Sequence, residues 1–303
     1  MFTPYVCVLH IFRSCIVRFN YFSFNIFSSF LARKQRDKRP LFFFSVFWYN
    51  KRQLLQKYFW RRKVFFFDFL MAWFGSIIFI AILPALILMI LIFRQDKIEK
   101  EPAGLLLKIF LLGAVSTILA GWLERLALMV LDVFHPNRYS TVYAFIEYFC
   151  IVALVEEGCK YLVMKKTTWR HPAFNYRFDA VVYGAFSALG FAAAENILYV
   201  LNLGIGVAPI RSVTAVPLHC ICGVFMGHYY GRQKACERWK MRGSQGLYKV
   251  LALLVPILIH GFYDFTATGT SALMRAVFVV FLVVLYIVTI LSVRRYSAED
   301  AYV

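Results

Sequence analysis

The sequence has few acidic residues and lacks the short motifs that mark the best-known catalytic and metal sites. Its 303 residues include 16 Asp and Glu against 34 Lys and Arg, a formal net charge of +18. The seven cysteines form no CxxC pair, so we infer neither a disulfide framework nor a thiolate metal site. HExxH is absent, which excludes a zincin-type site, and no GxSxG element or Ser-His-Asp set is visible. Any chemistry must therefore come from residues dispersed along the chain.

The basic excess does not indicate a nucleic-acid partner. The Lys and Arg residues form short clusters between apolar runs, which is the pattern of cytoplasmic loops in membrane proteins. No basic domain and no aromatic-plus-basic sheet pattern is present. We therefore expect the chain to sit in a lipid bilayer and to bind no nucleic acid.

Long runs of apolar residues are the most abundant feature of the sequence. Apolar residues make up 61% of the sequence, the mean hydropathy is +0.65, and runs of about twenty apolar residues are long enough to cross a bilayer. Backbone polar groups must be paired internally in lipid, so these runs predict helices. Small residues between 184 and 194 predict that the fourth span lies at the centre of the bundle. The expected fold is an all-α polytopic transmembrane helix bundle with about seven spans, at 72–93, 104–131, 141–164, 179–202, 207–231, 247–267 and 271–293.

The loops between these spans differ in charge. Alternate loops, beginning with the one after the first span, carry 15 Lys and Arg, whereas the other set has Arg138 and little else. The positive-inside rule places the richer loops in the cytoplasm. From Met71 onward we expect an outer N-terminus, a cytoplasmic C-terminus, cytoplasmic loops at 165–178 and 232–246, and an outer loop at 132–140.

Residues 1–70 differ in composition from the rest of the chain. They contain 16 of the 32 phenylalanines and 13 of the 34 basic residues, but only two acids. Phe, Lys, Asn, Ile and Tyr have A/T-rich codons, and a dense basic run on the outer side of the first span would violate the positive-inside rule. We expect this segment to be translated upstream DNA, with Met71 the true start, or a disordered basic and aromatic segment. The membrane domain is then 71–296, followed by a short cytoplasmic tail at 297–303.

Ionisable side chains inside the predicted spans carry the functional information. A charged side chain at mid-membrane costs roughly 2.5–3.5 kcal/mol on insertion scales, so these groups must face one another or a wet cavity. Residues four apart share a helix face, so each helix presents one polar stripe. Four spans contribute such residues: Glu156, Glu157 and Lys160 from the third, Glu195 from the fourth, His219 from the fifth, and His260 and Asp264 from the sixth.

A purely structural interpretation competes with a shared site. Glu156, Glu157 and Lys160 could form a structural salt bridge, but polar groups from four separate helices favour a common cavity. At 1.5 Å per residue, the span ends leave roughly 10 Å between the depths of Glu156 and His260. A helix tilt of about 20° and a kink at Pro256 would close this gap. Snorkelling or local pairing is expected for the polar residues near span ends, namely Lys108, Glu124, Arg125, Glu147 and His228.

These residue types support hydrolysis by two routes. A carboxylate buried beside a second carboxylate is suited to remove a proton from water as general base. A neutral histidine can stabilise an oxyanion or carry the proton, and an acid four residues away can orient it. Alternatively, Glu and His from three helices could bind one Zn²⁺ and activate water through the metal.

Four motifs in order resemble the PrsW-type intramembrane proteases, which are related to the CAAX prenyl proteases and bacteriocin-immunity proteins. Glu156-Glu157-Gly158-Cys159-Lys160 is similar to the EExxK signature, and Phe191-Ala192-Ala193-Ala194-Glu195-Asn196 to the FxxxEN element. His219 and the pair His260 and Asp264 match the remaining two motifs in order and spacing, and Lys100-Glu101-Pro102 resembles the early EP loop. The resemblance covers about residues 71–295.

The resemblance implies an intramembrane peptidase that hydrolyses a peptide bond in or near a membrane-embedded protein substrate. Regulated proteolysis of an anti-sigma factor is the familiar example, and the implied location is the bacterial cytoplasmic membrane. The implied catalytic residues are Glu156, Glu157, Lys160, Glu195, Asn196, His219, His260 and Asp264, and the candidate metal ligands are Glu157, Glu195, His219 and His260.

The resemblance also implies roles. Glu156 or Glu157 is the general base, and Lys160 balances their charge. The two histidines stabilise the oxyanion or bind a metal, Asp264 orients His260, and the FxxxEN residues complete the pocket.

Three positions depart from the pattern of the wider superfamily. Glu195 stands where a histidine is usual, Asp264 replaces an asparagine, and Tyr161 stands where an arginine is usual. Both a metal-free glutamate mechanism and a divalent metal such as Zn²⁺ therefore stay open. The rival function is a non-enzymatic transporter or immunity-type binding protein that uses the same polar cavity. The inverted repeats that would favour a transporter are not visible.

Overall fold

The structure is a computed structural model that describes residues 68, 71–72 and 75–303. The expectations for residues 1–70 concern positions that, apart from Asp68, lie outside the described part. Between residues 75 and 303 there is no strand, and an isolated β-bridge joins Tyr176 and Tyr302. The all-α fold is confirmed.

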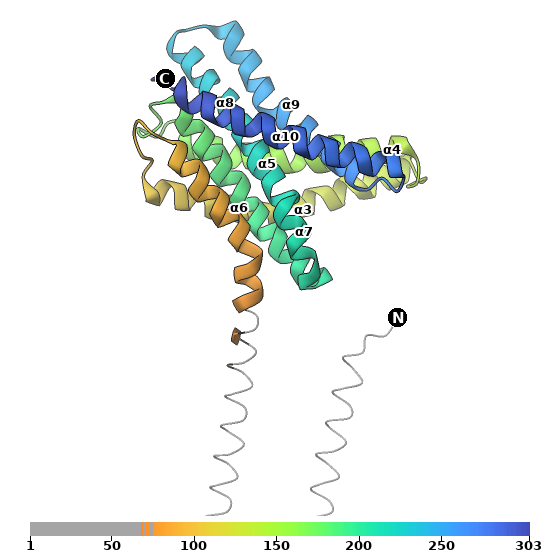
Figure 1. The fold of residues 1–303 in the computed structure, drawn as a ribbon. Helices are drawn as coiled ribbons and strands as arrows, with labels where there is room; N and C mark the ends of the chain where they lie inside the picture. The colour runs from red at the N-terminus through yellow and green to blue at the C-terminus, as the bar shows by residue number, and fades with distance from the viewer. Residues whose placement is uncertain (1–67, 69–70, 73–74) are drawn as a thin grey trace, which may run out of the picture. The chain divides into compact units, whose positions relative to one another are not determined.

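The helices follow one another with short connections (Figure 1). Two of them, η1 and η2, are a π-helix and a 3-10 helix. After Gly75–Gln95 the elements are α3 (Ala103–Phe134), α4 (Thr141–Phe145), η1 (Ile146–Val152), α5 (Ala153–Thr168), α6 (Arg177–Leu203), η2 (Ile205–Val207), α7 (Ala208–Val213), α8 (Ala215–Arg238), α9 (Arg242–Ala267) and α10 (Ala272–Ala298).

Six helices in the described residues are long and apolar enough to cross a membrane, close to the number predicted. They are Gly75–Gln95, α3, α6, the segment Ile205–Arg238, α9 and α10. The remaining predicted span, 141–164, is helical throughout as α4, η1 and α5. It is less apolar than its neighbours because it carries Glu147, Glu156, Glu157 and Lys160. The segment that departs from a plain apolar helix is thus the one that carries the acidic pair.

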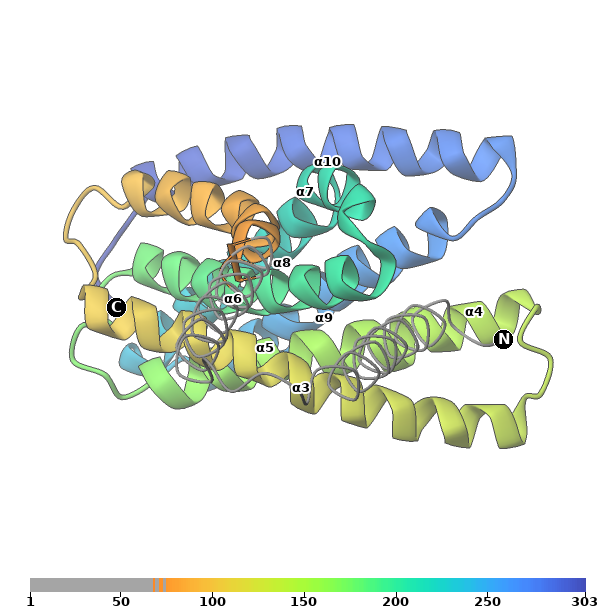
Figure 2. The ribbon, with the colours of Figure 1, turned by 90° about the horizontal axis from the view of Figure 1, so that it is seen from below.

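The helix α6 lies at the centre of the bundle. In its most apolar 18-residue stretch 78% of the residues are buried, against 17% in α10 and 22% in Gly75–Gln95. It packs against α3 and α8, and α8 packs in turn against α9. Figure 2 shows α10 along one edge of this arrangement, away from α3. The central position predicted from the small residues of the fourth span is confirmed.

Glycines at the crossing of α6 and α8 let the two backbones meet. A Cβ atom at Gly184 would overlap the carbonyl oxygen of Gly223, and a Cβ at Gly223 would overlap the carbonyl oxygen of Gly184. Gly227, one turn further along α8, has the same relation to the carbonyl of Ala180. This close approach of small residues four apart is a common way for membrane helices to associate without a hydrophobic driving force.

We expect Gly184→Ala to lower the stability of the protein, because the added methyl group fits only if α6 moves away from α8. Overpacking of this kind costs about 1–3 kcal/mol and should lower the Tm in detergent by several degrees. Gly121→Ala on α3 is the matched control, since no heavy atom lies within 4 Å of a Cβ there. Equal Tm values for the two variants would contradict this role of Gly184.

The loops predicted to be cytoplasmic meet at one end of the bundle. The Ser297 hydroxyl donates to the carbonyl of Gln95, and the Val303 N–H donates to the carbonyl of Asn175 at 2.8 Å. Arg238 Nη1 donates to the carbonyl of Val303 at 2.7 Å. These bonds join the segments that follow the first described helix, α5, α8 and α10. All four therefore lie on the same side of the bundle.

Candidate active site

The acidic pair and its lysine lie on α5, directly after a π-helical segment. The wider turn of η1 spans residues 146 to 152, and π-helical turns are frequent at functional sites. Glu156, Glu157 and Lys160 are buried, with exposed fractions of 5%, 0% and 0%. The three side chains face the protein interior, as the cost of placing charges in hydrocarbon requires.

Lys160 lies at the centre of the site. Its Nζ is 3.1 Å from Glu156 Oε2, 2.7 Å from Glu157 Oε1 and 2.8 Å from His219 Nδ1. A lysine ammonium only donates hydrogen bonds, so His219 accepts at Nδ1 and carries its proton on Nε2. The ammonium also stands 4.3 Å from the ring centre of Phe191, which begins the FxxxEN element. The EExxK segment and the FxxxEN element are thus in direct contact.

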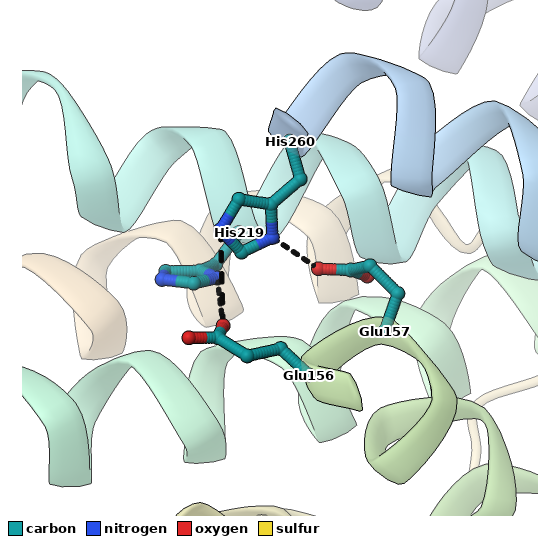
Figure 3. A group of neighbouring side chains, drawn as sticks. All are labelled: Glu156, Glu157, His219 and His260. Atoms are coloured by element: carbon teal, nitrogen blue, oxygen red, sulfur yellow. Dashed lines mark hydrogen bonds and ion pairs between the residues drawn. The ribbon is translucent and has the colours of Figure 1, made fainter. Parts of the chain in front are cut away.

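His260 reaches the same acids from α9. Its Nδ1 lies 2.8 Å from Glu157 Oε1, and its Nε2 lies 3.3 Å from Asp264 Oδ2 and 3.8 Å from Glu156 Oε2. Both ring nitrogens face carboxylate oxygens, so the ring can donate from both. The depth difference of roughly 10 Å estimated from the span ends is closed. Figure 3 shows His260 and Glu157 pointing toward each other from two helices.

His219 joins the cluster from α8 and has Glu195 behind it. Its Nε2 lies 2.8 Å from Glu195 Oε2, and its ring centre is 5.2 Å from that of His260. Glu195 therefore holds the ring nitrogen opposite the one that faces Lys160. An acceptor in this position fixes the tautomer and the orientation of the imidazole.

Arg211 is a site residue that the sequence predictions omit. Its Nη2 lies 2.8 Å from Glu195 Oε2, and its Nε donates to Asn196 Oδ1 at 3.0 Å. Asn196 Nδ2 donates to the carbonyl of Ala81 at 2.7 Å, so Asn196 joins α7 and the first described helix to α6. The sequence signal for Arg211 was a lone arginine in an apolar stretch, eight residues before His219.

Glu124 also faces the site, from α3. It lies one turn after Ala120, which packs against Cys159 and Phe191. The charges that act on Glu124 are those of Glu195, Lys160, His260 and Asp264. The sequence predicted snorkelling or local pairing for Glu124 because it lies near the end of a predicted span. Its contact with the site was missed because periodicity alone does not show which face of a long apolar helix meets the bundle.

The ion-paired groups of the site leave one negative charge in excess, and Glu124 faces the site as a further acid. The three cationic groups are Lys160, Arg211 and His260 when doubly protonated, and four carboxylates face them. The acids are Glu156, Glu157, Glu195 and Asp264. The side chains of Glu195 and Asp264 are 17% and 23% exposed, so the site opens on their side. An excess negative charge suits a site that takes up a proton or a further cation.

The loop that resembles the EP element lies apart from this cluster. Glu101 accepts a hydrogen bond from the Tyr183 hydroxyl, and burial raises the pKa of Glu101 to about 7. Burial also raises the pKa of Asp96, in the same loop, to about 6. The loop is a second buried acidic region, at the end of the bundle where the basic loops meet.

The residues of the cluster fit a divalent metal in donor type and spacing. Glu156, Glu157, His219 and His260 each offer one ligand atom, and these atoms lie within 4.8 Å of one another. Glu157 Oε2 is buried and has no hydrogen-bond partner within residues 75–303, which is costly unless a proton or cation meets it. The predicted metal set includes Glu195, whereas the structure groups Glu156 with the other three. Glu195 instead lies 2.8 Å from His219 Nε2, the ring nitrogen that faces away from Lys160.

The chain is similar to known proteins over most of its length. The model of the family described as PrsW family intramembrane metalloprotease matches residues 101–291. Protease PrsW of Oceanobacillus iheyensis is 34% identical over 220 residues, which cover 73% of this chain and 95% of that protein. Protease PrsW of Clostridioides difficile is 31% identical, with 72% and 90% covered, and that of Bacillus subtilis is 31% identical, with 65% and 84% covered. No solved structure matches the chain.

Proposed function

The chain belongs to the PrsW family of intramembrane metalloproteases, and we propose that it hydrolyses a peptide bond by activating water at the buried Glu–His cluster. The observation that carries this proposal is the convergence of Glu156, Glu157, His219 and His260 within 4.8 Å. As a multi-pass membrane protease it acts on a substrate in or near the bilayer. The proposed substrate class is a single-span regulatory protein such as an anti-sigma factor, in line with the resemblance of its four motifs.

Glu156 is the proposed general base. Its Oε2 accepts a hydrogen bond from Lys160 Nζ at 3.1 Å, while its Oε1 makes no hydrogen bond within the described residues. That oxygen can take a proton from a water molecule as the water oxygen adds to the peptide carbonyl carbon. The same carboxyl then returns the proton to the leaving amine as the C–N bond breaks.

The neighbouring groups hold this base and stabilise charge. Glu157 Oε1 accepts from both Lys160 and His260, so it keeps the two cations in position. His260 Nε2–H, which Asp264 Oδ2 faces at 3.3 Å, is the proposed donor to the oxyanion that develops on the carbonyl oxygen, and the oxyanion would replace Asp264 as the acceptor of this proton. Asp264 and Glu195 act as positioning residues, each on one histidine.

A metal would be held by Glu156, Glu157, His219 and His260, and the Lys160 ammonium, which contacts three of these residues in this structure, would have to be displaced by it. When bound, a divalent ion supplies Lewis acidity to water and to a carbonyl oxygen. Glu195 and Asp264, on the second nitrogens of the two histidines, would keep the imidazoles aligned for such an ion.

The test is cleavage of a single-span substrate by the purified protein in proteoliposomes. We expect cleavage, its loss on adding a chelator, and its recovery on adding Zn²⁺, because the donor set and the family both favour a metal. The positive control is Protease PrsW of Bacillus subtilis, reconstituted in separate liposomes together with its own substrate. Cleavage that persists with chelator would assign the reaction to the Glu–His residues alone. If the control cleaves and this protein cleaves neither the single-span substrate nor the substrate of the control, the rival binding function is favoured.

The proposed location is the cytoplasmic membrane, with the basic loops and the C-terminus in the cytoplasm. On a cysteine-free background, we expect single cysteines at Arg170 and Arg238 to resist a membrane-impermeant thiol reagent in intact cells. A cysteine at Arg138, on the opposite set of loops, is expected to label. Labelling of the first two positions and protection of the third would reverse the orientation.

A further inference from the structure

A polar cavity of about 360 Å³ lies at the ends of α5, α8 and α9. This volume is within the range of small-molecule sites. The cavity is separate from the Glu–His cluster, because none of the residues that line it belongs to that cluster. It faces the end of the bundle at which the basic loops meet. Nothing described so far uses it.

The wall of the cavity is strongly basic. Lys165, Arg242 and Lys249 come from two helices, and none of them forms an ion pair within the described residues. Glu237 is the acid of the wall, and its Oε2 lies 3.3 Å from the Nζ of Lys234, which is outside the wall. Three unpaired cations thus converge on a space whose acid already has a partner. An anion in this space would be attracted by all three cations.

Two further features add hydrogen-bond donors. Gln233 is 4% exposed and lines the cavity. Its Oε1 accepts from the Tyr161 hydroxyl at 3.4 Å, and its Nε2 donates to no group within the described residues. The helix α9 begins at Arg242 with no acid in its first turn, and Arg242, Gln245 and Gly246 of its first turns line the cavity, so the positive end of its dipole lies on this side. A buried amide donor and a positive helix end therefore meet the same space as the three cations.

We propose that this cavity binds a phosphate-bearing anion. A phosphate carries up to two charges and several acceptor oxygens, which match three cations, an amide donor and a helix N-terminus. A single carboxylate would leave most of these donors unused. The phosphate belongs either to a soluble phosphorylated compound or to a phospholipid headgroup at the bilayer surface. Both sources present the same group to the cavity.

The position of the cavity links it to the catalytic helices. The three helices that contribute to its wall also carry the catalytic cluster. Glu156 and Glu157 lie on α5, His219 lies on α8 and His260 lies on α9. An anion that joins Lys165 to Arg242 and Lys249 holds the ends of α5 and α9 together. The binding proposal itself does not depend on peptidase activity, because it is tested by binding alone.

The experiment compares two phosphate probes on the purified full-length protein. Inorganic pyrophosphate is titrated into the protein in detergent at low salt by calorimetry. Phosphatidylglycerol is presented in nanodiscs, with phosphatidylcholine as the reference, and bound lipid is counted by native mass spectrometry. The variants are Lys165→Gln and Arg242→Gln. Lys166→Gln is the control, because Lys166 is next to Lys165 in the sequence but does not line the cavity. The Tm of each unliganded variant shows that it is folded.

Each cavity variant is expected to bind at least about tenfold more weakly than the wild type, the usual loss for a charge-assisted hydrogen bond. The control is expected to stay within about twofold of the wild type. Loss in the pyrophosphate arm identifies a soluble ligand, and loss only in the nanodisc arm identifies a lipid headgroup. No binding in either arm, or equal binding by the wild type and both cavity variants, overturns the proposal.

Discussion

Glu156→Gln is expected to lower the cleavage rate by about 10²–10⁴-fold, the usual contribution of a general base. The amide has nearly the shape of the carboxylate but cannot accept a proton from water. Glu157→Gln should be similarly severe, because its Oε1 binds Lys160 at 2.7 Å and His260 at 2.8 Å and would lose the charge that holds both. The measurement is the initial rate of substrate cleavage in proteoliposomes, with expression and Tm recorded for each variant.

Glu147→Gln is the matched control for both substitutions. Glu147 precedes the pair on the same helical segment, and the charges that act on it are those of Arg138 and Asp132 and, more weakly, Asp264, with neither histidine among them. We expect its cleavage rate to stay within about twofold of the wild type. If Glu156→Gln and Glu157→Gln both cleave as fast as the wild type, the proposed mechanism is wrong and the cavity is more simply a binding site.

Lys160→Met is expected to be the most destabilising single substitution in the site. The ammonium is 0% exposed and contacts Glu156 and Glu157, so its removal leaves two buried carboxylates without their shared cation. Breaking a buried ion pair in this way costs about 3–5 kcal/mol, a Tm decrease of about 10 °C by thermal unfolding in detergent. Cleavage should be lost as well.

A double variant separates charge from packing. Adding Glu157→Gln to Lys160→Met removes one of the two carboxylate charges that have lost the lysine, so part of the lost stability should return. Loss of packing alone would leave the double variant no more stable than Lys160→Met. A Lys160→Met protein as stable as the wild type would show that the lysine does not balance the acids.

Most of the fold could be predicted because lipid leaves the backbone few choices. An apolar run without water must satisfy its own N–H and C=O groups, so length and composition already specify helices. The interruptions could not be predicted in this way. The span predicted at 207–231 is divided by the turn at Thr214, and the π-helix η1 breaks the regularity of 141–164. The break at Thr214 has a local signal, because Pro217 three residues later has no N–H to bond the Val213 carbonyl, whereas the π-helix leaves no such pattern in the chain.

The membership of the site was partly predictable for an energetic reason. Charges such as Lys160 have no low-energy position in a bilayer except beside opposite charges, so the residues that had to converge could be named in advance. Glu124 was missed because it lies on a long apolar helix whose inward face the periodicity does not reveal. Arg211 was missed because it lies on the short helix α7, near the end of a predicted span, where an arginine is usually interfacial. Knowing that charges must meet does not specify which atoms meet.

The sequence by itself therefore determined that this protein is an all-α membrane protein with a buried Glu–Lys–His site. Both statements follow from the high free energy of exposed backbone and charge in hydrocarbon. The tertiary structure alone decided that His260 contacts Glu157, that Glu195 lies behind His219, and that Lys160 stands between the acids. These pairings depend on the tilts and crossings of separate helices. The crossings arise from side-chain packing between helices such as α6 and α8, which are distant in sequence.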